Sequence, residues 1–353
     1  MRICLTSLLL LCFACNETKR PLESIAEPIG IDQTITDQSQ YSTLGLTKLS
    51  EYNFFDGKLS DLIPSKRVIS YDLNTPLFSD YAKKKRFIYL PEGLKIGYRE
   101  NEILDFPIGT VLIKNFFYSS GQLQVGTAKI LETRLLIREN DGWVALPYVW
   151  NHEQTEAYLE ITGGKIPVTL RNKRQINYLI PDMNQCKSCH DKGSKMTPIG
   201  PSVRQLNRLS DSEKKNQLEI LRDHAWIDLP SHELPKLAVW NNNKTGTLSE
   251  RARAYLDINC AHCHNDEGPA KNSGLNLTVF ETDSYRLGVN KKPVAAGRGS
   301  GNLKYSIVPG HPEQSILIHR MQTIEPGTMM PELGRTVPHK EGVALIKEWI
   351  KNL

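Results

Sequence analysis

Hydrophobic and polar positions divide the chain into an N-terminal half with strand-like patterns and a C-terminal half with helix-like patterns. Five segments between residues 41 and 185 are short, rich in β-branched and aromatic residues and bounded in several cases by turn-forming residues, which predicts strands. These segments are Arg86–Leu90, Thr110–Tyr118, Glu132–Glu139, Trp143–Trp150 and Gln175–Ile180. Because the connections between them are short, we expect an antiparallel meander.

Helical spacing dominates the C-terminal half. The segment Thr247–Glu250 has the spacing of a capping box, which predicts a helix that begins there and runs through Arg251–Ile258. A second helix is expected near Ile316–Met321, and a third within His339–Leu353. The apolar residues of the third follow one helical stripe, namely Val343, Ile346, Trp349, Ile350 and Leu353.

These patterns predict the α+β class, with an antiparallel β-rich domain over residues 41–205 and a small all-α domain over residues 247–353. Residues 206–246 are expected to form a helical linker, with a helix over Asp211–Trp226 that follows a capping box at Ser210–Glu213. The length of 353 residues agrees with two domains of ordinary size.

Composition and charge exclude several classes of protein. Hydrophobic residues make up 39% and charged residues 24%, which fits neither a disordered chain nor a membrane protein with many spans. The formal net charge of +5 is small for this length and argues against a nucleic-acid partner. The basic run Lys83–Arg86 could dock an acidic partner, but we expect it to lie on a solvated strand edge.

The N-terminus has the pattern of an export signal. Residues 1–14 are expected to be a signal peptide, because Arg2 precedes an apolar core, Leu5–Phe13, that is too short to span a bilayer. Ala14-Cys15 resembles the end of a lipoprotein signal, which implies a lipid on Cys15 and a membrane anchor; a plain secretory signal cleaved nearby is the alternative. Residues 15–40 are expected to be a polar tether. We therefore expect a location at the bacterial cell envelope, facing the periplasm or the surface.

Four of the seven cysteines form two Cys-x-x-Cys-His motifs, at Cys186–His190 and Cys260–His264. Two thiols three positions apart can each add to a vinyl group of one porphyrin, and the next residue places an imidazole at the iron. A zinc site usually separates its cysteine pairs by about 15–20 residues, and the two pairs here lie much farther apart. A redox dithiol usually occurs singly, whereas this chain has two pairs. We therefore expect two covalently bound haem c groups. The expected attachment residues are Cys186, Cys189, Cys260 and Cys263, and the expected axial ligands are His190 and His264.

The C-terminal domain resembles the small all-α cytochrome c domain. The helix that enters Cys260–His264 and the segment Gly327-Thr-Met-Met-Pro331 carry this resemblance. In that family a methionine directly before proline is the distal iron ligand, which implies that role for Met330, with Met329 as its near neighbour. Met321 is expected to pack in the core. Ligation by histidine and methionine suits electron transfer.

The N-terminal half resembles the cytochrome P460 / c′-β group, a β-sheet fold with its haem motif after the last strands. Phe106–Lys114 and Gly142-Trp143, followed by the first cysteine pair, carry this resemblance. Over nearly its whole length the chain also resembles an uncharacterised family of bacterial dihaem c-type cytochromes. The segments that carry it, besides both haem motifs, are Thr75–Tyr81, Trp150–Glu156 and Pro198–Asn207.

The distal ligand of the first iron stays open at this point. Met183 lies beside the attachment site, and Met196 follows His190 too closely to reach round the porphyrin, so methionine is not expected. The remaining candidates are His152, His224 and His232, or no protein ligand at all. His152 is the most interesting of them because of its polar and aromatic neighbours.

Three functions remain open, and they differ at the sixth position of the first iron. The leading hypothesis is an electron carrier that serves redox partner proteins of the cell envelope. The second is a haem redox enzyme, peroxidase-like or P460-like, that uses an open first haem. The third is a sensor of diatomic ligands. The sequence contains no recognisable catalytic triad, phosphate-binding loop or carboxylate pair that would favour a function without haem.

Overall fold

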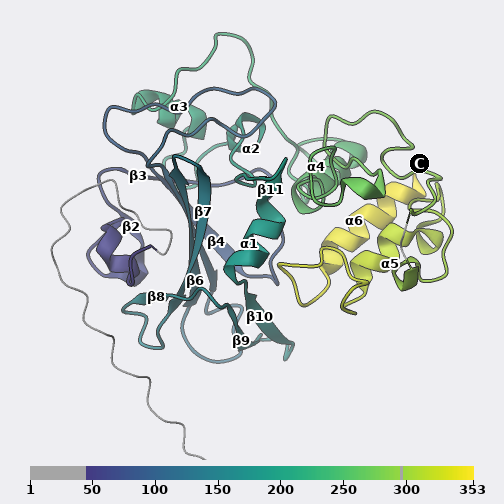
Figure 1. The fold of residues 1–353 in the computed structure, drawn as a ribbon, viewed down its shortest axis with the longest axis horizontal. Coiled ribbons are helices and arrows are strands. Elements are labelled where there is room, and N and C mark those ends of the chain that lie inside the picture. The colour runs from purple at the N-terminus through teal and green to yellow at the C-terminus, as the bar shows by residue number, and fades with distance from the viewer. Residues whose placement is uncertain (1–44, 295–296) are drawn as a thin grey trace, which may run out of the picture. The chain divides into compact units, whose positions relative to one another are not determined.

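An antiparallel sheet of six strands is the largest element of the fold (Figure 1). The computed structural model describes residues 45–294 and 297–353. The predicted signal peptide, the predicted tether and Cys15 therefore lie outside the described residues. The strands follow one another in chain order: β3 (Val68–Tyr71), β4 (Lys83–Tyr89), β5 (Val111–Tyr118), β6 (Lys129–Glu139), β7 (Gly142–Trp150) and β8 (Ala157–Leu159). The predicted antiparallel meander is confirmed.

Three short hairpins accompany this sheet. They pair β1 (Phe55–Asp56) with β2 (Ile63–Pro64), β9 (Gly164–Thr169) with β10 (Gln175–Ile180), and β11 (Asp191–Lys192) with β12 (Lys195–Met196). The segment over residues 175–180 is a strand as predicted, but it pairs with β9 and does not join the meander.

Six α-helices and five short 3-10 helices complete the described residues, so the chain is a mixed α+β protein. The α-helices are α1 (Met183–His190), α2 (Val203–Leu206), α3 (Gln217–Asp223), α4 (Leu248–Asn259), α5 (Ile316–Gln322) and α6 (Lys340–Lys351). The 3-10 helices are η1 (Leu49–Tyr52), η2 (Leu59–Asp61), η3 (Lys271–Ser273), η4 (Gly297–Ser300) and η5 (Pro312–Gln314).

The helix predicted over residues 211–226 is shorter than expected. It begins at Gln217, because the side chain of Asn216 accepts a hydrogen bond from the backbone N–H of Leu218 and caps the helix there. The hydroxyl of Ser210 does accept the N–H of Glu213 at 3.3 Å, but this contact lies in a turn before the helix.

One face of the large sheet is apolar along its whole middle. Phe87, Ile113, Leu135 and Leu146 lie opposite one another on four neighbouring strands and pack in one core with η1 and the loop after it. Each of these four side chains is buried. This face therefore holds the sheet to the start of the described chain.

The other face has three zones. At one end Ile88 and Leu112 pack against α2 and α3, so the segment over residues 206–246 contributes to the core of the sheet. At the other end Phe116 packs with Tyr178 of the β9–β10 hairpin. Helix α1, which carries the first Cys-x-x-Cys-His motif, lies along the sheet between α2 and β10 (Figure 1).

The helices α4, α5 and α6 form the C-terminal core. Leu256 of α4, Ile318 of α5 and Ile346 of α6 are among its buried residues. The capping box at Thr247 and Glu250 starts α4, as predicted. No helix of the described residues is both long enough and apolar enough to cross a membrane.

Polar contacts link the strand-rich half to the helical half. The backbone N–H of Phe78 donates to the side-chain oxygen of Asn259 at 2.9 Å. Asp80 accepts from the backbone N–H of Thr336 at 2.7 Å, and Arg204 pairs with Asp257 at 3.1 Å. Just after α1, the backbone N–H of Gly193 donates to the carbonyl of Glu267 at 2.9 Å. Because Glu267 follows the second motif closely, the two motifs lie near each other.

Candidate functional site

Helix α1 presents the first motif. The side chain of Asp182 accepts the N–H of Gln185 at 2.8 Å, and the side chain of Gln185 accepts the N–H of Asp182, so a capping box fixes the start of the helix. Cys186 and Cys189 are three residues apart and share one face of the helix. His190 is the last residue of α1. The motif is therefore held at the end of a short, capped helix.

The proton of His190 can be assigned from its hydrogen bond. Its Nδ1 lies 2.8 Å from the carbonyl oxygen of Thr197, which can only accept. Nδ1 therefore carries the proton, and Nε2 keeps a free lone pair. Burial lowers the pKa of His190 to about 3, so the imidazole is neutral at pH 7. A neutral imidazole with a bonded Nδ1 is the usual state of a metal-ligating histidine.

A cavity of about 80 Å³, the first cavity, lies between α1 and the sheet. Cys186, Cys189 and His190 line it from the helix side. Arg86, Lys114, Arg134 and Leu136 are among the sheet residues that line it.

The second motif follows α4 directly. Cys260 is the residue after the helix, and its carbonyl accepts the N–H groups of Cys263 at 3.1 Å and His264 at 2.9 Å. This turn brings the two cysteines and the histidine close together.

His264 has the same proton arrangement as His190. Its Nδ1 lies 3.0 Å from the hydroxyl of Ser273, and that hydroxyl already donates to the carbonyl of Ala270 at 2.7 Å. The hydroxyl therefore accepts from Nδ1–H, and Nε2 of His264 keeps its lone pair. Burial lowers the pKa of His264 to about 4.

A second cavity, also of about 80 Å³, is lined by Cys260 and by both Met330 and Met321. Tyr255 and His339 also line it, and their side chains approach to 3.0 Å. Met329 is half-buried and is not among the lining residues. Met330 is thus the methionine of the Met-Met-Pro segment that reaches this cavity.

The backbone of Met330 is fixed on both sides. Its N–H donates to the carbonyl of Arg320 at 2.8 Å, and its carbonyl accepts from the guanidinium of Arg335 at 2.9 Å. Met321 is 5% exposed and belongs to the C-terminal core, as predicted, although it also touches the cavity.

The two cavities share one wall. Seven residues line both of them: Lys114, Arg134, Cys189, His190, Ile199, Leu333 and Gly334. The two motifs therefore lie next to each other, although they are far apart along the chain. Groups bound in the two cavities would be neighbours.

The residues present fit two covalently attached haems. Among the described residues, all four motif cysteines are free thiols. Burial raises the pKa of Cys186 to about 11 and those of Cys260 and Cys263 to about 12, so these thiols are protonated at pH 7. The described part of the chain contains no cluster of three or more His, Cys, Asp or Glu side chains able to hold a bare metal ion. A haem iron does not need such a cluster, because the porphyrin supplies four ligands and the protein only the axial ones.

The other candidate histidines lie away from both cavities. His152 is exposed in the turn between β7 and β8, His224 is exposed at the end of α3, and His232 is exposed beside Glu100. None of the three is among the residues that line the first cavity. The structure thus does not bring His152 to the first motif.

Several residues at the cavities were not expected from the sequence. Lys84 and Arg86 were expected on a solvated strand edge, which is wrong because β4 is an interior strand and Arg86 is 4% exposed. Lys114 of β5 lies opposite Arg86. Burial, together with the charges of Arg86 and Arg134, holds the pKa of Lys114 well below its usual value. The two-residue period of a strand puts Lys84 and Arg86 on the side of β4 opposite to the exposed Lys83 and Lys85, but four successive basic residues give no sign of this in the sequence.

Comparisons with protein-family models, with curated proteins and with solved structures found no match to this chain. The function of the two cavities is therefore argued from the residues of this chain alone.

Proposed function

We propose that this protein is an exported dihaem c-type cytochrome that transfers electrons at the cell envelope. One observation carries the proposal. At each of two motifs, two free thiols stand beside a histidine whose Nδ1 is hydrogen-bonded and whose Nε2 is free. This is the donor set that a covalently attached haem requires.

The haem groups would supply reversible one-electron chemistry at iron, and the protein's own residues determine where they sit. Cys186 and Cys189 would hold one haem by thioether bonds with His190 as its axial ligand. Cys260 and Cys263 would hold the other in the same way, with His264. The shared wall of the cavities supports transfer between the two sites, because it allows them to lie side by side.

Met330 is proposed as the distal ligand of the second iron. It lines the second cavity, and its backbone is held by Arg320 and Arg335, which restrains its side chain. A thioether ligand favours the reduced state and leaves no open position, which suits electron transfer.

A second candidate function is supported by the lining of the first cavity. Among the described residues that line it, His190 is the only histidine, and no methionine is present. An iron held there by His190 would keep a position for an external ligand. This favours a haem redox enzyme, peroxidase-like or P460-like, or a diatomic-ligand sensor as the alternative.

The location is part of the proposal. Export and a lipid on Cys15 would place both haems at the bacterial envelope, facing the periplasm or the surface, within reach of redox partner proteins. Covalent attachment suits an exported protein because it retains the haem outside the cytoplasm.

A potentiometric titration of the purified protein tests the proposed function. We expect two one-electron transitions in the visible spectrum, and a single one in each of the paired variants Cys186→Ala/Cys189→Ala and Cys260→Ala/Cys263→Ala. The absence of any reversible haem transition would contradict electron transfer. If the wild type shows a single transition, and this transition disappears in either paired variant, the result would contradict two separate haems.

A further inference from the structure

Three cations lie directly opposite one another on three neighbouring strands. Arg86 of β4 pairs in register with Lys114 of β5, and Lys114 pairs in register with Arg134 of β6. We call these three residues the cation row. Like charges in directly opposite positions of an antiparallel sheet repel each other. Such a row therefore needs compensating negative charge.

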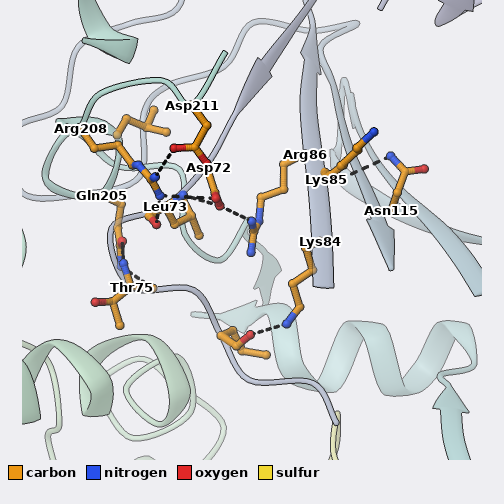
Figure 2. Close-up of polar contacts among 12 residues, drawn as sticks. Asp72, Leu73, Thr75, Lys84, Lys85, Arg86, Asn115, Gln205, Arg208 and Asp211 are labelled. Atoms are coloured by element: carbon orange, nitrogen blue, oxygen red, sulfur yellow. Dashed lines mark hydrogen bonds and ion pairs between the residues drawn. The ribbon is translucent and has the colours of Figure 1, made fainter. Parts of the chain in front are cut away.

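Lys84 adds a fourth cation on the same face. It lies two residues before Arg86, and the side chains of both extend to the same side of β4, whereas that of Lys85 extends to the other side (Figure 2). The ammonium group of Lys84 donates to the carbonyl of Leu77 at 2.7 Å. It has no carboxylate partner among the described residues.

The guanidinium of Arg86 is only partly satisfied. Its Nη1 pairs with Asp72 (Figure 2), but the buried Nε and Nη2 atoms have no hydrogen-bond partner among the described residues. Nε and Nη2 form the edge of a guanidinium that binds a carboxylate with two parallel hydrogen bonds. Only 4% of Arg86 is exposed, so two N–H donors without an acceptor lower the free energy of unfolding here.

The carboxylates nearby do not balance these charges. Arg134 is neutralised by Glu132 through two bonds of 2.6 and 2.9 Å. Asp72 is shared between Arg86 and Arg208. The ammonium group of Lys114 has neither a hydrogen bond nor an ion pair with any described residue, and lies 5.1 Å from the ring of Phe116.

The N–H donors of Arg86 and Lys114 that lack an acceptor in the described chain belong to residues that line the first cavity. All three residues of the cation row line the first cavity together with Cys186 and His190. Lys114 and Arg134 also line the second cavity. An anion bound by the row would thus lie against the first haem motif, close to the shared wall.

We propose that the cation row is a binding site for an oxyanion of carboxylate size, held by the free edge of Arg86 and the ammonium of Lys114. Arg134, whose charge is paired with Glu132, would line the site without binding the anion. Two sources share this chemistry: a carboxylate of the haem attached at Cys186 and Cys189, or a free small anion such as nitrite or formate. The first source rests on the proposed function, and the second does not.

The test uses the full-length protein as purified, with its haem content measured first. Lys114→Met removes the charge at similar volume, Lys114→Arg keeps the charge, and Arg86→Lys keeps the charge but loses the two-pronged edge. Lys85→Met is the matched control. Lys85 lies on β4, the strand of Arg86, but it is exposed on the opposite side of the sheet. Arg86→Lys and Lys114→Arg keep the test valid if Lys114→Met folds poorly.

Calorimetric titration with nitrite and with formate separates the two sources. If the anion is free, the wild type binds one equivalent, and Lys114→Met and Arg86→Lys weaken binding by about tenfold or more, while Lys85→Met does not. If a haem carboxylate fills the site, no free anion binds. In that case Lys114→Met lowers the reduction potential of the first haem, because removing a nearby positive charge stabilises the oxidised iron, and Lys114→Arg and Lys85→Met leave it in place.

The proposal is overturned if no anion binds and Lys114→Met has the same first-haem potential as Lys85→Met. A protein without haem at Cys186 and Cys189 that still binds nitrite through Lys114 would refute the proposed function but support the anion site. The two failures can therefore be told apart.

Discussion

The carboxylate of Asp80 holds Thr336 by two hydrogen bonds. One oxygen accepts the backbone N–H at 2.7 Å, and the other accepts the hydroxyl at 2.9 Å. Asp80 is 2% exposed and also accepts the N–H of Val337 at 3.1 Å. This side chain of the strand-rich half thus anchors the segment that follows Met330 in the helical half.

Replacing Asp80 with Asn should loosen that segment. The amide oxygen can still accept the N–H groups of Thr336 and Val337, but a neutral acceptor binds them more weakly than a carboxylate does, and the amide N–H now faces the Thr336 hydroxyl. We expect a loss of about 1–3 kcal/mol in the free energy of unfolding and a weaker sulfur-to-iron absorption band. Denaturant unfolding and optical spectra measure both, with Asp56→Asn, at an exposed position, as the control. Equal behaviour of the two variants would contradict the anchoring role.

Met330→Ala should remove the sulfur-to-iron band and lower the potential of the second haem, because the thioether favours reduced iron. Met329→Ala should keep both properties, since Met329 does not line the second cavity. Optical spectroscopy and potentiometry are the measurements. A band that survives in Met330→Ala and disappears in Met329→Ala would show that the assignment is reversed.

His339 should make stability depend on pH. Its ring stacks on Phe78 with centroids 4.2 Å apart, and burial lowers the pKa of His339 to about 4. The unfolded state, with a histidine pKa near 6.5, binds more protons between pH 6.5 and 4, so stability present above pH 6.5 is lost as the pH falls through this window.

Burial lowers the pKa values of His190, His262 and His264 as well, so His339→Gln should make the decline in unfolding free energy between pH 6.5 and 4 shallower without abolishing it, by about 3 kcal/mol at most. His152→Gln, at an exposed turn, should leave the decline as in the wild type. Denaturant unfolding at several pH values gives the result. An unchanged slope in His339→Gln would rule out this histidine as the cause.

The local parts of the fold could be predicted from the sequence. Strands β4 to β7 and helices α4 to α6 were found because strand composition, turn residues and the Thr247 capping box act over a few neighbouring residues. The pairing of β10 with β9 was missed, since strand pairing depends on contacts that short spacing does not encode. The start of α3 was misplaced because Ser210 and Asn216 both offer capping side chains, and packing selects Asn216.

The candidate site could likewise be predicted only in part. Both Cys-x-x-Cys-His motifs and Met330 are visible as short patterns. The structure places Cys186, Cys189 and His190 at the first cavity and Cys260 and Met330 at the second, whereas Cys263 and His264 line neither. The cation row could not be predicted, because its three residues come from three strands and meet only through the sheet register. The partners of His190 and His264 likewise belong to no motif: Thr197 lies in a loop after β12, and Ser273 ends the short helix η3.

Carbon monoxide should bind one haem of the reduced protein and leave the other unchanged. The reason is that the described lining of the first cavity offers no methionine or second histidine, whereas Met330 lines the second cavity. Difference spectra measure the stoichiometry, and Met330→Ala should raise it from one to two. If neither haem of the wild type binds carbon monoxide, the first iron has a strong sixth ligand, and Lys114, which lines its cavity, is the residue to replace next.

The number of covalently bound haems tests the central claim most directly. A pyridine haemochrome assay combined with intact mass spectrometry should give two haems per chain. The Cys186→Ala/Cys189→Ala protein should carry one, and so should Cys260→Ala/Cys263→Ala. A wild-type protein with one haem or none, or with haem that acid acetone extracts, would contradict the account.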